Sequence, residues 1–140
     1  MGGGKYGRNN RRQSRRQLAA QKRELEAERS WLPDADEPTE EQTVPTEVTA
    51  TARVTQRTVR YVRTGMLCEF AVVVSEHDGR GWAERLCIDT CKHGTVHRHR
   101  NGDHKSDPET IRNIESASDI QQGLSDALDE AYDLINDEEG

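Results

Sequence analysis

The chain has 140 residues and a formal net charge of −6. Its apolar content is 31%, against ~45–50% in an average globular protein, so much of the chain is expected to lie outside a packed core. It contains no run of about 18 apolar residues and no apolar segment behind the N-terminus, which argues against a membrane span and a secretory signal. Three cysteines do not form a closed disulfide framework, so we expect a cytoplasmic protein with reduced thiols.

The charge is divided into four blocks along the chain. Residues 1–23 carry eight basic residues and no acidic one, whereas residues 24–47 carry nine acidic residues and a single arginine. Residues 48–105 have a formal charge of +4, and residues 106–140 have a formal charge of −10. Blocks of this kind act through long-range fields and association with partners more than through packing.

Residues 1–32 are predicted to form a basic arm that is disordered or partly helical. The first eleven residues are mainly Gly, Arg and Asn without periodicity, and good helix formers with little apolar content follow as far as Leu32. The arginines expected to contact phosphate groups of a nucleic acid are Arg8, Arg11, Arg12, Arg15 and Arg16. The alternative is a solvated tail whose charge serves solubility.

Residues 33–47 are predicted to be an acidic, extended linker, because they hold three of the four prolines and six acidic residues. From Val48 onward β-forming residues dominate, so a small α+β domain is expected over 48–140. It follows that the chain has three parts: the arm, the linker and one folded domain.

Four strands are expected in this domain, over about 50–63, 66–75, 82–89 and 95–100. The apolar phase of the first strand slips between Val54 and Val59, which predicts a bulge. The second strand is the most apolar run of the chain and is therefore expected at the centre of the sheet. Strict alternation in the third strand would place Trp82, Leu86 and Ile88 on one face.

The C-terminal part changes to helical periodicity. A short helix is predicted over 108–115, and a second helix is predicted to begin at Ser118, which with Gln121 fits a capping box. The second helix has an apolar stripe at Ile120, Leu124, Ala127, Leu128, Ala131 and Ile135. The predicted fold class is therefore α+β, with a four-stranded antiparallel β-meander packed on a C-terminal amphipathic helix.

The segment from Cys87 to His104 holds two of the three cysteines and four of the five histidines. One interpretation is a zinc-stabilised hairpin, with Cys87, Cys91, His93 and His97 as the four ligands, because these are the residue types that bind zinc. The spacing argues against it, since the segment contains no pair of cysteines two residues apart. No cofactor is therefore favoured, and zinc remains the alternative.

A second interpretation is catalysis. His97 and His99 are two residues apart on a predicted strand, so their side chains should share one face, with Asp89 across the hairpin. Two neighbouring imidazoles can act as general base and general acid in phosphodiester cleavage, as in a small metal-independent ribonuclease.

A third interpretation is that the same side chains form the polar face of a half-exposed hairpin that binds RNA, DNA or an acidic protein. Here Arg98 and Arg100 join the arginines of the arm as nucleic-acid contacts. The cysteines would then be small core residues. We favour this interpretation, because most histidine clusters on exposed strands are not active sites.

The stretch from Ile88 to His99 resembles a signature in a family of small uncharacterised proteins from actinobacteria and their phages. The shared positions are Asp89, His93, Gly94, His97 and His99. The resemblance covers about residues 60–100, and it implies a β-hairpin core and a phage or mobile-element setting. The family carries no established activity that would transfer to this chain.

The sequence as a whole predicts a small accessory binding protein whose partner is a nucleic acid or an acidic protein, with no membrane contact. The alternatives are the paired-histidine ribonuclease and the zinc-stabilised module.

Overall fold

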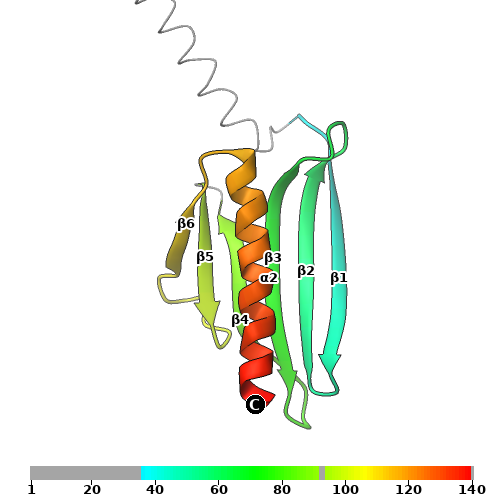
Figure 1. Cartoon of the computed structure of the whole chain (residues 1–140), viewed down its shortest axis with the longest axis vertical. Coiled ribbons are helices and arrows are strands. Elements are labelled where there is room, and N and C mark those ends of the chain that lie inside the picture. The colour runs from blue at the N-terminus through cyan, green and yellow to red at the C-terminus, as the bar shows by residue number, and fades with distance from the viewer. Residues whose placement is uncertain (1–35, 92–93, 140) are drawn as a thin grey trace, which may run out of the picture.

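The computed structural model describes residues 36–91 and 94–139. They form a six-stranded antiparallel meander, in which the spatial order of the strands equals their order in the sequence, followed by one helix (Figure 1). The elements are β1 (Thr39–Thr49), β2 (Ala52–Tyr61), β3 (Leu67–His77), β4 (Trp82–Cys91), β5 (Thr95–Arg100), β6 (Glu109–Asn113) and α2 (Ala117–Glu139). The α+β class, the antiparallel sheet and the C-terminal helix are confirmed, but the sheet has six strands, not four.

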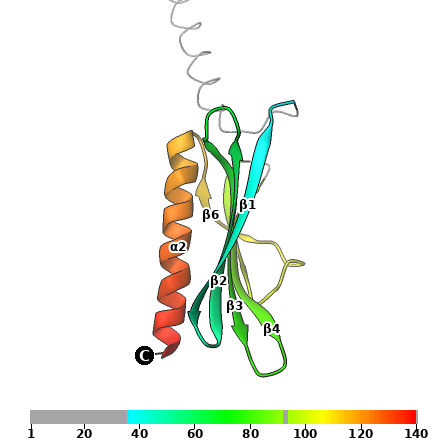
Figure 2. The ribbon, with the colours of Figure 1, turned by 90° about the vertical axis from the view of Figure 1, so that its right-hand side faces the viewer.

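The helix α2 lies along one face of the sheet, over its central strands (Figures 1 and 2). The main core forms between them, from side chains that alternate along β2 to β5 and side chains at helical spacing on α2. Among its fully buried members are Phe70, Val72, Val74, Leu86, Ile88, Ile120 and Ile135. A Cβ atom on Gly123 would lie 3.2 Å from Val96 Cγ2, so this glycine allows the helix to approach the sheet closely.

The opposite face of the sheet carries no helix of the described part of the chain (Figure 2). A smaller buried cluster of Val59, Tyr61 and Cys68 lies at the end of the sheet near the β2–β3 turn. Within the described ranges, no helix is both long and apolar enough to cross a bilayer.

Strand β1 overturns the linker predicted over 33–47 from Thr39 onward. Ten of its residues pair with β2, from Thr39 opposite Tyr61 to Thr49 opposite Ala52. Most side chains of β1 are exposed, as expected for an unpacked segment. Its backbone, however, is paired with β2 and not extended in solvent. Pro45 is tolerated because an edge strand leaves one row of N–H groups without a partner strand.

Strand β6 replaces the helix predicted over 108–115. Its residues pair with β5, from Asn113 opposite Thr95 to Glu109 opposite Arg98. An eight-residue helix is marginal alone, whereas pairing with the open edge of β5 gives the same residues backbone hydrogen bonds.

The start of α2 also differs from the prediction. The capping residue is Ser116, whose Oγ accepts a hydrogen bond from the Asp119 N–H at 3.3 Å, and the Asp119 carboxylate accepts one from the Glu115 N–H at 3.0 Å. The capping box therefore lies two residues before the predicted one at Ser118 and Gln121.

Candidate functional site

The two faces of β5 carry different chemistry. His97 is paired with Asp89, and His99 is paired with Cys87, so all four project from the side of the sheet opposite α2, which we call the histidine face. Arg98 projects to the helix side. Strand alternation thus brings His97, His99 and Asp89 together as the sequence predicted, and their catalytic role stays a prediction.

The two histidines have different surroundings. The His97 Nε2 atom forms a 2.7 Å hydrogen bond with Thr95 Oγ1, whereas His99 Nε2 lies 3.7 Å from Asp89 Oδ1. The His99 side chain is only 12% exposed, and its Nδ1 atom is buried without a hydrogen-bond partner. His99 is therefore largely enclosed and holds a polar atom without an internal partner.

A third histidine, His104, comes to the same place from the segment after β5. Its ring lies 4.5 Å from the His99 ring, centroid to centroid, and its Nε2 atom lies 2.6 Å from Glu84 Oε2. Figure 2 shows this segment, in yellow, on the side of the sheet away from α2. Sequence reasoning noted His104 but gave it no role, and it missed Glu84 entirely.

A bulge in β4 explains why Glu84 could not be placed from the sequence. Val74 pairs with Leu86 but Ser75 pairs with Glu84, so Arg85 is the extra residue of β4. Without the bulge, Glu84 and Cys87 would point to opposite faces, because they are three residues apart. The sequence signal for such a bulge is weak.

The same bulge reverses the predicted position of Trp82. This side chain does not join Leu86 and Ile88 on the helix side. Instead it contacts His77 and lies beneath the Arg53 guanidinium, whose central carbon is 4.2 Å from the ring centroid. Trp82 is 38% exposed, so this stacked pair lies at the surface.

On the histidine face, the carboxylates of Glu84 and Asp89 and the guanidinium of Arg57 act on Cys87. Burial raises the pKa of Cys87 to about 12, and the neighbouring Asp89 and Glu84 carboxylates add to this rise. Burial also raises the pKa of Asp89, although nearby histidines, His99 first, act in the opposite direction. An isolated thiolate is therefore strongly disfavoured here, and Cys87 is a neutral thiol at pH 7.

Arg98 is committed to contacts on the helix side. Its guanidinium donates to both carboxylate oxygens of Glu130, through Nε at 2.8 Å and through Nη2, and its Nη1 lies 2.9 Å from Glu109 Oε2. Its side chain is 14% exposed. The structure therefore does not place Arg98 where it would touch a nucleic acid, while Arg100, at the end of β5, is exposed.

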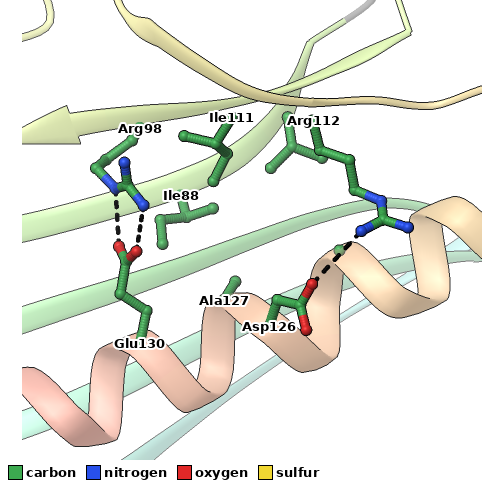
Figure 3. A pocket seen from close by; sticks show the side chains of 9 residues that line it. Ile88, Arg98, Ile111, Arg112, Asp126, Ala127 and Glu130 are labelled. Atoms are coloured by element: carbon green, nitrogen blue, oxygen red, sulfur yellow. Dashed lines mark hydrogen bonds and ion pairs between the residues drawn. The ribbon is translucent and has the colours of Figure 1, made fainter.

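A pocket of about 200 Å³ lies between β5, β6 and α2 (Figure 3). Its lining residues are Ile88, Val96, Arg98, Ile111, Arg112, Gly123, Asp126, Ala127 and Glu130. The charged groups in its wall pair across the pocket, Arg98 with Glu130 and Arg112 with Asp126. These pairs join β5 and β6 to the helix, so we assign the pocket wall a structural role.

The four predicted zinc ligands are not brought together as predicted among the described residues. His93 and the side chain of Cys91 lie outside them, and Cys87 faces His99 and not His97. A different group with metal-binding donors is present: one ligand atom each of Glu84, Cys87 and His104, all within 4.8 Å of one another.

Comparisons of the chain with family models, with curated proteins and with solved structures find no match. The resemblance to the actinobacterial and phage family therefore stays a prediction. The predicted phosphate contacts in the arm, from Arg8 to Arg16, lie outside the described residues.

Proposed function

We propose that this chain is a small nucleic-acid-binding accessory protein whose phosphate contacts come from residues 1–23. The observation that carries the proposal is the separation of charge. Residues 1–23 hold eight basic residues and no acidic one, whereas residues 36–140 hold eleven basic and 22 acidic residues. Clusters of arginine and lysine without acids bind the phosphate backbone by releasing its counterions.

The contacts within the folded domain also support phosphate binding by the arm and not by the domain. Arg98 is shared between Glu130 and Glu109, and Arg57 is shared between Glu41 and Glu69. These guanidinium groups are already paired with carboxylates of the same domain. The sequence-based set of nucleic-acid contacts is therefore reduced to the arginines of the arm and the exposed Arg100.

The ribonuclease alternative has one observation in its favour, which is that His97, His99 and Asp89 share a face. Electrostatics weigh against it. A phosphodiester beside these histidines would meet Asp89 and Glu84, and the arginines of β5 project from the other side of the sheet. Arg57, whose charge acts on Asp89 from the same face, is already paired with Glu41 and Glu69. Cleavage without a metal needs a cation to stabilise the developing charge on the phosphate.

The test compares the salt dependence of binding for two variants of the full chain. In the first, Arg8, Arg11, Arg12, Arg15 and Arg16 are changed to Gln. In the matched control, five cations of the folded domain are changed to Gln, namely Arg60, Arg63, Arg80, Arg85 and Lys105. Fluorescence anisotropy with labelled duplex DNA and single-stranded RNA gives log K against log salt.

We expect the arm variant to lose most of its affinity and the slope to fall by about 0.7–0.9 per lost phosphate contact. The control should change binding much less. Equal losses in both variants, or no binding by the wild type, would overturn the proposal. If the wild type cleaves the RNA in EDTA and His99→Ala abolishes this, the ribonuclease function replaces it. Binding to an acidic peptide but to neither nucleic acid would indicate a protein partner.

A further inference from the structure

Three side chains that bind transition metals meet on the histidine face, and a fourth, His99, lies beside His104. Glu84 and Cys87 come from β4, His99 from β5, and His104 from the segment after β5. They supply a carboxylate oxygen, a thiol sulfur and two imidazole nitrogens. A mixed set of nitrogen, oxygen and sulfur donors in fourfold coordination suits Zn²⁺ better than Mg²⁺ or Ca²⁺, which prefer oxygen alone.

The distances are close to those of a bound ion. The ligand atoms of Glu84, Cys87 and His104 all lie within 4.8 Å of one another. In a tetrahedral zinc site, bond lengths of about 2.0–2.3 Å place neighbouring ligand atoms about 3.3–3.8 Å apart. Side-chain rotations that move these atoms by about 1 Å would therefore bring the three ligand atoms to the spacing of a tetrahedral site. The His104 side chain is 48% exposed, so it has room to rotate in this way.

His99 fits the fourth position. Its Nδ1 atom is buried without a hydrogen-bond partner, which is costly for a polar atom, and its ring already contacts the His104 ring. Its other nitrogen, Nε2, lies near Asp89 Oδ1. A histidine that binds a metal through one nitrogen usually donates from the other to a carboxylate, so Asp89 is placed as the outer partner.

The backbone holds the donors in position. The bulge at Arg85 turns Glu84 to the side of Cys87. After β5, Asn101 and Gly102 both have positive φ, and the Asp103 N–H donates to the Arg100 carbonyl oxygen at 3.0 Å, which is a tight turn of the primed type. Asp103 Oδ1 then accepts from the Lys105 and Ser106 N–H groups. Ordered turns on both sides thus place His104 above β4.

We propose that Glu84, Cys87, His99 and His104 bind one Zn²⁺ ion, which fastens the segment after β5 to the sheet. All four positions are then occupied by protein ligands, so the ion has a structural role. The carboxylates of Glu84 and Asp89, both of which act on Cys87, complement a divalent cation. This proposal is independent of the proposed nucleic-acid binding, because no residue of 1–23 takes part in it.

Cobalt(II) gives the most direct test, because a thiolate–cobalt bond produces a charge-transfer band in the near ultraviolet. Full-length protein freed of metal with a chelator is titrated with Co²⁺ and then with Zn²⁺. We expect one cobalt ion per chain, a thiolate band, and loss of the band when zinc displaces cobalt. Cys87→Ser should abolish the band. His104→Ala should weaken binding by more than the roughly 10–100-fold that loss of an outer partner costs.

The controls separate this site from the four residues suggested by the sequence alone. His97→Ala and Cys91→Ser should keep the band and the affinity, whereas Asp89→Asn should lower the affinity about 10–100-fold. Because His104 lies in an exposed segment, His104→Ala should leave the fold intact. Circular dichroism of the variant checks this. The proposal is overturned if the wild type binds no cobalt, or if the band survives Cys87→Ser and disappears with Cys91→Ser.

Discussion

The guanidinium of Arg98 joins three elements through its contacts with Glu130 of α2, shown in Figure 3, and with Glu109 of β6. The hydrogen bonds to Glu130 raise the pKa of Arg98 above its ordinary value, so it is charged at neutral pH. Bidentate pairs of arginine with a carboxylate are among the stronger ion pairs in proteins. Glu130 is 36% exposed, so solvent screens part of the interaction.

We expect Arg98→Met to lower the free energy of unfolding by about 1–2 kcal/mol. This is less than the roughly 1.5–3 kcal/mol of a hydrogen bond to a charged group, because solvent screens part of the interaction. Urea denaturation measures the change. Arg100→Met, on the same strand but exposed, is the matched control and should change stability by no more than about 0.5 kcal/mol. If both substitutions lower the free energy of unfolding equally, the ion pair of Arg98 with Glu130 has no specific stabilising role. A double-mutant cycle with Glu130→Gln isolates the coupling between them.

At the scale of elements, the N-terminus of α2 is closed by Ser116 and Asp119. The hydrogen bond from the Glu115 N–H is the main cause that lowers the pKa of Asp119 below its ordinary value, and Arg112 adds to it. Because the folded-state pKa is the lower one, the ionised carboxylate stabilises the protein at pH values above about 4. That contribution is lost as the pH falls through the folded-state pKa.

We therefore expect Asp119→Ala to cost about 1 kcal/mol at pH 7, as loss of a helix cap does, and progressively less as the pH falls below about 4. Urea unfolding at pH 7 and pH 3 gives both values. Asp129→Ala, at an exposed position in the middle of α2, should change stability much less at pH 7. A cost for Asp119→Ala that is the same at both pH values would show that its charge is not involved.

The elements differ in how far the sequence could predict them. Strands β2 to β5 and the helix α2 were predicted because alternation and helical periodicity follow directly from burial of one face. Strand β1 was missed because its side chains are exposed on both faces, so its sequence shows no alternation of apolar and polar residues. Pro45 and the acidic residues are also typical of a linker. In the candidate site, the shared face of His97 and His99 was predictable from strand geometry. The approach of His104 to Glu84 was not, because it depends on a bulge and a distant turn.

At the scale of the whole molecule, the boundary of the folded domain moves from residue 48 to the start of β1. The backbone of β1 pairs with β2 over most of its length, and β1 also forms one edge of the sheet. Removing β1 would leave the N–H and C=O groups of β2 without their strand partner and create a new exposed edge. Such edges reduce stability and promote association between chains.

Two fragments test this boundary. Residues 36–140 should fold cooperatively, because they include every described element, although they carry a formal charge of −11. Residues 48–140, the domain predicted from the sequence, should be less stable by at least about 2 kcal/mol, since several backbone hydrogen bonds of about 0.5–1.5 kcal/mol net each are lost. Urea denaturation and sedimentation measure stability and association. Equal stability of the two monomeric fragments would show that β1 is dispensable and would restore the boundary predicted from composition.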